Sequence, residues 1–308
     1  MKQTGVRVTS PTEEINQRTG NLDTVSTIEL VRLLNEEDLR VPGTVAELLP
    51  ELAALVDVAV DRVEAGGRVH YFGAGTSGRL GILDAAELMP TFGVGQEVVI
   101  AHQAGGPAAF VTAVEDAEDV EEPTDTHDVR PGDVVIGLAA SGRTPYVGAA
   151  LATARALGAP TALVTSNPDA PLAALADHLL VADTGPEALT GSTRLKAGSA
   201  QKLILNTFST ALMVRLGHTY GNLMVDLQAT NAKLRGRSLE IVAQATGAGP
   251  ADAAAALDEC GDIKTAVVYL LAREADHPAP TAARCRIALA DSGGRVRQAL
   301  TSLGISRN

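Results

Sequence analysis

The chain has 308 residues, of which 45% are hydrophobic and 20% are charged, as is ordinary for a globular protein with a sizeable buried core. Its formal net charge is −12, only 3% of its residues are aromatic, and it contains no tryptophan. Because a nucleic-acid-binding surface needs clustered cations and usually stacking rings, these values argue against nucleic acid as a partner.

Neither the N-terminus nor the cysteines point to export or to a membrane. Residues 1–11 include basic residues without an apolar stretch behind them, and no run in the chain approaches membrane-spanning length. Cys260 and Cys285 stand at no zinc-binding or redox spacing, so we expect reduced thiols in the cytoplasm. The histidines are assigned structural or surface roles because none shows metal-ligand spacing, with His102 noted because its strand is expected to end near the site. They are His70, His102, His127, His178, His218 and His277.

The first elements predicted along the chain are two N-terminal helices. Residues 27–35 and 44–63 have helical patterns. The second is expected to kink or split at Pro50, since proline lacks the amide hydrogen that a helix interior needs. We expect these helices to pack on the domain that follows or on a second subunit.

A parallel sheet is predicted for the middle of the chain. Residues 68–72 and 97–102 are predicted strands on either side of a helix at 80–88, which makes a strand–helix–strand unit. Such alternation implies an α/β fold with helices on both faces of the sheet, and ligands then bind at the carboxyl ends of the strands. The pattern repeats with strands at 133–138, 160–165 and 178–182 and a helix at 146–157.

The last third of the chain is predicted to be helical. A long apolar-periodic segment at 197–216 indicates a buried helix, and the composition changes beyond about residue 233. We expect N-terminal helices over 1–58, the sheet domain over 59–232 and a small helical module over 233–308. The module's predicted helices are 239–245, 250–258, 263–273 and 278–300, with breaks at Gly247, Gly249 and Gly261.

Three loops rich in glycine and hydroxyl side chains are the candidate ligand-binding segments. They are the first loop at residues 73–79, the second at 140–145 and the third at 191–198, and the first two directly follow predicted strands. Bare backbone amides and hydroxyl groups at helix starts bind phosphate groups. Ser192 of the third loop has an alternative role as a simple helix cap. Cations in or beside the loops could offset the acidic charge of the chain; these are Arg79, Arg143, Arg194, Lys196 and Lys202.

The first loop also matches a dinucleotide-binding pattern. Gly73, Gly75 and Gly78 have the G-x-G-x-x-G spacing after a strand. That fingerprint requires an acidic residue at the end of the next strand, whereas Glu97 stands at the beginning of that strand. Dinucleotide binding therefore stays as a less favoured alternative, as does the possibility that these glycines only make tight turns.

The loops and their neighbours resemble the N-acetylmuramic acid 6-phosphate etherase family over nearly the whole chain. The similar stretches are residues 73–87 (GAGTSGRLGILDAAE), 139–146 (AASGRTPY), 191–198 (GSTRLKAG) and 220–226 (YGNLMVD). The resemblance implies a homodimer built from a sugar isomerase (SIS) domain with a flavodoxin-like three-layer fold, followed by a small helical domain like a ubiquitin-associated (UBA) domain. It also implies a sugar phosphate as the small-molecule partner.

The activity implied by the resemblance is cleavage of a lactyl ether, a reaction that requires no metal and no redox cofactor. In the open-chain sugar, a base removes the proton on carbon 2, lactate is eliminated from carbon 3, and water adds back to give N-acetylglucosamine 6-phosphate and D-lactate. Glu87 matches the family's acid and Glu118 its base. Without the resemblance, Glu118 would be assigned to a solvated face, because it stands among Glu115, Asp116, Asp119, Glu121 and Glu122.

The resemblance also assigns the residues that bind the substrate. One departure is Leu88-Met89, where the family commonly has Cys-Pro, and this change could alter packing or substrate preference. A sugar-phosphate-binding regulator and a sugar-phosphate isomerase remain the alternative functions. Lys196 is also a candidate for contact with a neighbouring subunit. The substrate-binding candidates are Gly75, Thr76 and Ser77 of the first loop, Ser141, Gly142 and Thr144 of the second, and Ser192 and Lys196 of the third.

Overall fold

The computed structural model describes residues 9–112, 114, 117–120, 124–229, 231–275 and 280–305. The chain divides into two compact units. The first comprises residues 1–86 and 96–209, and the second comprises residues 87–95 and 210–308. The neighbours of Glu118 at positions 115, 116, 121 and 122, and His277, lie outside the described residues.

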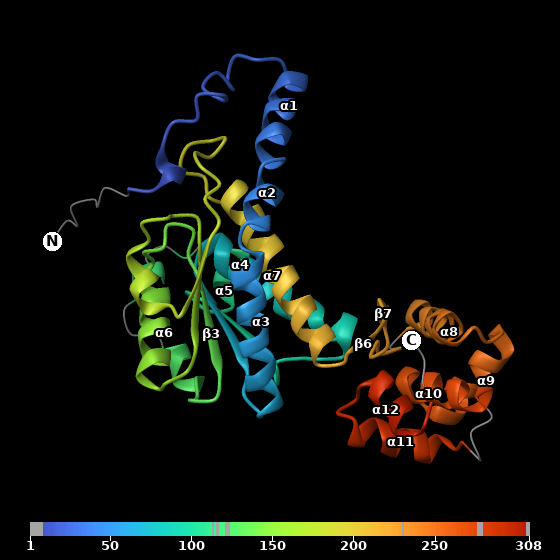
Figure 1. The fold of residues 1–308 in the computed structure, drawn as a ribbon. Coiled ribbons are helices and arrows are strands. Elements are labelled where there is room, and N and C mark those ends of the chain that lie inside the picture. Colours follow the sequence, from blue (N-terminus) through green and yellow to red (C-terminus); the bar gives the residue numbers. More distant parts are fainter. Residues whose placement is uncertain are drawn as a thin grey trace. The chain divides into compact units, whose positions relative to one another are not determined.

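A five-stranded parallel sheet forms the centre of the first unit (Figure 1). Its strand order is β2-β1-β3-β4-β5, which is the order of flavodoxin-like doubly wound folds. The predicted parallel α/β sheet is therefore confirmed. Its strands are β1 (Val69–Gly73), β2 (Val99–Gln103), β3 (Val134–Leu138), β4 (Thr161–Thr165) and β5 (His178–Val181).

Helices cover both faces of this sheet (Figure 1). Successive side chains of a strand point to opposite faces, and in β1 the buried Tyr71 faces one layer while Phe72 faces the other. The Tyr71 ring packs against Phe208 of α7 (Lys196–Arg215). Phe72 instead packs with Tyr146 of α6 (Pro145–Ala156). Helix α4 (Gly75–Phe92) begins earlier than predicted, inside the first loop.

The N-terminal helices are divided as predicted, but at a different residue. The break between the second and third helices falls at residues 47–48, and both Pro42 and Pro50 stand in the first turn of a helix. Proline is tolerated there because the first amide hydrogens of a helix have no partner within it. These helices are α1 (Thr27–Asp38), α2 (Val41–Ala46) and α3 (Leu49–Glu64). Short elements of the unit are η1 (Pro11–Glu13), α5 (Ala108–Val111), η2 (Ala117–Asp119), η3 (Thr124–Asp128) and η4 (Pro171–Leu175).

The second unit contains a short hairpin and a helical module with its own apolar core. The breaks predicted at Gly247 and Gly261 are confirmed, because both residues end helices in the left-handed conformation. The single helix predicted for residues 278–300 is wrong, since Gly293 and Gly294 have φ angles of 58° and 75° and separate two helices. The hairpin was not predicted. The elements are β6 (Thr219–Tyr220), β7 (Leu223–Met224), α8 (Ala232–Thr246), α9 (Pro250–Cys260), α10 (Ile263–Glu274), α11 (Ala282–Asp291) and α12 (Val296–Ser302).

Three further features concern the cysteines, the helices and the possible metal ligands. Cys260 and Cys285 are buried free thiols. Within the described ranges, no helix is both long and apolar enough to cross a membrane. The same residues include no group of three histidine, cysteine or carboxylate side chains that could hold a metal ion.

Candidate functional site

The first and second loops lie side by side between β1 and β3, where the strand order of the sheet reverses. β1 and β3 are neighbouring strands, with Gly73 opposite Leu138. From β1 the chain continues to β2 on one side, whereas β4 and β5 extend the sheet beyond β3 on the other side. Ligands of doubly wound sheets bind in the crevice at this switch point.

The first loop is a tight turn between β1 and α4. A Cβ atom on Gly73 would lie 2.6 Å from the Gly78 nitrogen, and one on Gly78 would lie 2.5 Å from the Gly73 oxygen. Only glycine therefore fits both positions. The turn places Thr76 and Ser77 in the first helical turn, where amide hydrogens have no partner within the helix.

The second loop is held against the end of β4. A Cβ atom on Gly142, which has a φ angle of 66°, would lie 2.3 Å from the Ala170 Cβ. Asn167 Nδ2 donates a hydrogen bond of 2.9 Å to the Ser141 carbonyl oxygen. Thr144 is the N-cap residue of α6, but its side chain makes no capping hydrogen bond. The hydroxyl group of Thr144 is thus available to a ligand.

The third loop leads into α7, whose first turn is already capped. Both carboxylate oxygens of the buried Glu187 accept hydrogen bonds, from the backbone amides of Lys196 and Ala197, each at 3.0 Å. Burial raises the pKa of Glu187, and the two amide hydrogen bonds act in the opposite direction. Ser192 is half-buried. The cap predicted as one role for Ser192 is supplied by Glu187 instead.

Lys196 lies in a buried ion pair and not on an open surface. Its side chain is 1% exposed, and Nζ lies 2.6 Å from Oε2 of Glu37, which is itself buried. Arg18 and Asn16 also donate hydrogen bonds to this carboxylate. Burial opposes ionisation of Glu37, but these hydrogen bonds outweigh it and lower its pKa to about 2. Contact between Lys196 and a substrate therefore stays a prediction.

The two glutamates proposed from the resemblance fall in different units. Glu87 belongs to the second unit and Glu118, in η2, to the first. Both side chains are exposed. By contrast, the nearby Asp84 is buried and accepts hydrogen bonds from Tyr71, Asn206 and Ser209. Burial raises the pKa of Asp84, and its partners identify it as a structural carboxylate.

His102 belongs to a hydrogen-bonded chain across one face of the sheet. Asp133 Oδ2 accepts from His70 Nε2 at 3.1 Å, and His70 Nδ1 lies 3.0 Å from His102 Nε2. Because Asp133 is an acceptor with a lowered pKa, neutral His70 carries its proton on Nε2 and accepts from His102. Burial and the neighbouring His70 lower the pKa of His102 to about 4, so both rings are neutral near pH 7.

Several polar groups near the strand ends were missed by the sequence reasoning. Gln103 ends β2 and Ser166 follows β4, and both side chains are buried with an oxygen that has no hydrogen-bond partner among the described residues. Arg143 Nε and both polar atoms of the Gln201 side chain are also buried and have no hydrogen-bond partner among the described residues. A buried polar atom without a partner is costly unless a ligand or water satisfies it. The available signal was a polar residue directly after a buried strand.

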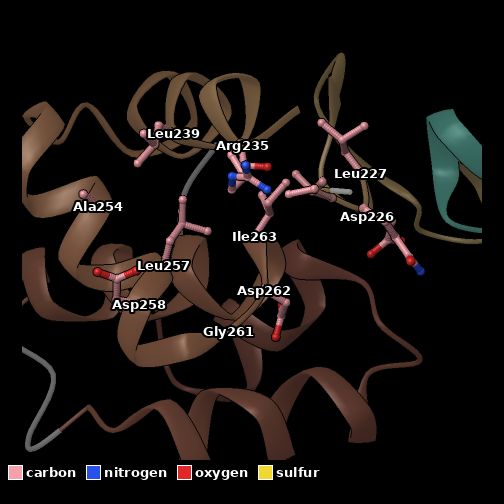
Figure 2. Close-up of a pocket in the computed structure, with 14 residues that line it drawn as sticks. Asp226, Leu227, Arg235, Leu239, Ala254, Leu257, Asp258, Gly261, Asp262 and Ile263 are labelled. Atoms are coloured by element: carbon pink, nitrogen blue, oxygen red, sulfur yellow. The ribbon is translucent and has the colours of Figure 1, made fainter. Parts of the chain in front are cut away.

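A cavity lies in the second unit, and its lining residues all follow the three loops in the sequence. It has a volume of about 650 Å³, and Leu227, Leu257 and Ile263 contribute apolar side chains to it (Figure 2). Its charged lining consists of three aspartates and one arginine: Asp226, Asp258, Asp262 and Arg235. This excess of carboxylates does not suit a phosphate-bearing ligand.

Comparison with known proteins places the chain in a family. It is 54% identical over 267 residues to the N-acetylmuramic acid 6-phosphate etherase of Thermobifida fusca. The matched segment covers 86% of this chain and 88% of that protein. The chain belongs to the N-acetylmuramic acid 6-phosphate etherase family. Other members of the etherase family are similar over almost the full length. Identity is 50% with the Streptomyces coelicolor protein (96% of this chain, 94% of that one) and 51% with the Rubrobacter xylanophilus protein (94% and 95%).

Two family profiles match the sheet domain. The profile for the SIS domain matches residues 108–211, and the profile for the N-terminal SIS domain of glucokinase regulatory protein matches residues 51–155. The first match includes the second and third loops, and the second match includes the first and second loops. The SIS fold expected from the etherase resemblance is thus confirmed.

Proposed function

We propose that the protein is an N-acetylmuramic acid 6-phosphate etherase, a carbon–oxygen lyase that releases D-lactate and N-acetylglucosamine 6-phosphate. The observation that carries the proposal is the pair of loops at the switch point. They present helix-start amides and free hydroxyl groups, in a chain about half identical to proteins named as etherases. The reaction would serve the recycling or catabolism of cell-wall amino sugars.

The loops bind the 6-phosphate in this proposal. Thr76, Ser77, Ser141 and Thr144 donate hydroxyl hydrogens, and the amides around Gly75 and Gly142 complete the cradle. Arg143 stands in the second loop with its Nε buried and unpartnered among the described residues, which supports an anion there. Ser192 is assigned to the border of the same site, and Lys196 holds the start of α7 beside it through its buried ion pair with Glu37.

The chemistry at the other end of the sugar is assigned to the two glutamates. Glu118 removes the proton on carbon 2, and Glu87 protonates the departing lactate oxygen. General acid–base catalysis by each group contributes about 10² to 10⁴-fold. Because both carboxylates are exposed in the single chain, we assign the working enzyme to a homodimer, in which a second copy can shield them. The proposal places the enzyme in the cytoplasm and the site in the domain over 59–232.

A regulator that binds a sugar phosphate without turning it over is the second candidate. The observation that favours the regulator is the match of residues 51–155 to the profile for the N-terminal SIS domain of glucokinase regulatory protein. The presence of glutamates at both positions 87 and 118, and identities near 50% to named etherases, favour the enzyme.

The test is to incubate the purified protein with N-acetylmuramic acid 6-phosphate and measure D-lactate. We expect lactate and N-acetylglucosamine 6-phosphate in equal amounts, and no lactate from unphosphorylated N-acetylmuramic acid. Binding of the sugar phosphate without lactate release would replace the enzyme with the regulator. Rearrangement of the sugar without lactate release would indicate an isomerase.

A further inference from the structure

A smaller cavity lies in the first unit, beside the first loop. It has a volume of about 370 Å³ and is lined by the first two turns of α4, the start of α7 and the α1–α2 junction. Thr76, a candidate phosphate ligand, is part of its wall. The starts of α4 and α7 lie close together here, since a Cβ atom on Gly198 would lie 3.5 Å from the Thr76 methyl group, an ordinary van der Waals distance.

The cavity holds two cations, Arg194 and Lys202, and Lys202 acts on the buried Asp84 only through a longer-range electrostatic effect that opposes the rise in the Asp84 pKa. Both cations line the cavity, and within the described part of the chain neither forms an ion pair or a hydrogen bond. Asp38 is the one carboxylate in its lining, so the cavity keeps an excess positive charge. In a chain with a net charge of −12, exposed cations without partners offer a local site for an anion.

The remaining wall of the cavity combines apolar side chains with the hydroxyl groups of Thr76 and Ser199. Val41, which is 1% exposed, and the half-buried Leu80 and Leu203 contribute aliphatic side chains. The complementary ligand is therefore small and carries both an anionic group and an aliphatic group. A free phosphate fits only half of this description.

The substrate of the proposed function carries such a group in addition to its phosphate. The lactyl ether on carbon 3 bears a carboxylate and a methyl group, and it lies three carbon–carbon bonds from the carbon that bears the phosphate. Thr76 belongs to the first loop and also lines the cavity, so a sugar anchored at the loop can extend its lactyl group into the cavity.

We propose that this cavity is the lactyl subsite, in which Arg194 and Lys202 bind the carboxylate and the Val41–Leu80–Leu203 wall receives the methyl group. The inference rests on the proposed function. It makes the two cations specificity residues that distinguish the ether-bearing substrate from the sugar product, which has the same phosphate and no carboxylate.

The experiment compares a ligand that has the lactyl group with one that lacks it. For the wild type, Arg194→Ala, Lys202→Ala and the control Arg237→Ala, kcat/KM is measured with N-acetylmuramic acid 6-phosphate, and the inhibition constant with N-acetylglucosamine 6-phosphate. Arg237 is an exposed cation of α8 in the second unit, so its removal changes the net charge equally. Arg194→Lys is included to retain the charge.

We expect kcat/KM to fall about 10- to 100-fold in Arg194→Ala and in Lys202→Ala, the scale of a lost charge-assisted hydrogen bond. The inhibition constant for the product should stay within about twofold, which also shows that the variants fold. Arg194→Lys should lose less than Arg194→Ala, and Arg237→Ala should match the wild type. Equal losses for both ligands would assign the cations to the phosphate and overturn the inference, as would no loss at all. A wild type that releases no lactate would refute the proposed function instead.

Discussion

The start of α7 and the second loop both concentrate polar groups, but they differ in what satisfies those groups. At α7, Glu37, Lys196 and Glu187 are all buried, and each has its partners within the protein. At the second loop, the Thr144 hydroxyl and the buried Arg143 Nε have no such partner among the described residues. A satisfied buried charge indicates scaffold, whereas an unsatisfied polar group at the carboxyl edge of the sheet indicates a ligand site.

Replacing the two exposed glutamates, Glu118 and Glu87, should have the largest expected effect on the activity of the ligand site. Glu118→Gln should lower lactate release by about 10² to 10⁴-fold, because a general base is lost. It should also abolish exchange of the carbon 2 proton with solvent deuterium, which mass spectrometry detects. Glu87→Gln should keep that exchange while losing lactate release.

Glu47→Gln, at an exposed position just after α2, is the matched control and should behave as the wild type. Normal deuterium exchange in Glu118→Gln would show that Glu118 is not the base.

The buried ion pair gives the largest effect on the scaffold side. Glu37→Ala leaves the Lys196 charge buried without its partner, and such a break typically costs about 3 to 5 kcal/mol. We expect this loss in the free energy of unfolding, measured with urea. Glu29→Ala also removes a carboxylate of α1, but from an exposed pair with Arg32, and should cost less than about 1 kcal/mol.

The pH dependence of unfolding provides an independent check on Glu37. Its pKa is lowered from 4.5 to about 2 in the folded protein, so the unfolded chain binds the proton first as the pH falls. The stabilisation is therefore complete above about pH 4.5 and is lost as the pH falls towards 2. Glu37→Ala should lack this part of the dependence. If both proteins had the same slope, the lowered pKa would be incorrect.

The smallest of these effects concerns a single loop hydroxyl group. Ser77→Ala should weaken binding of a sugar phosphate by about 1 to 3 kcal/mol, the value of a hydrogen bond to a charged group. Calorimetric titration with N-acetylglucosamine 6-phosphate measures it. Thr207→Ala removes a hydroxyl from an exposed position of α7 and should leave the affinity unchanged. An unchanged affinity in Ser77→Ala would remove Ser77 from the site.

Sequence reasoning placed the five strands within about two residues because they are short apolar runs bounded by turn signals. It missed the β6–β7 hairpin, whose strands have two residues each and so carry no periodicity. It also joined α11 to α12, since two glycines within a helical pattern do not reveal that both adopt positive φ angles.

The sequence by itself determined the parallel sheet, the loops at the carboxyl ends of β1 and β3, and the family, because these depend on local patterns and on long motifs. Only the tertiary structure decided which charges are free. Glu37 and Lys196 are 159 residues apart, and their pairing depends on how α1 packs against α7. That contact separates Lys196 from Arg194 and Lys202, which the sequence had grouped as equivalent cations. Whether a side chain finds a partner or remains available to a ligand is set by three-dimensional proximity and burial, which residue type and spacing do not encode.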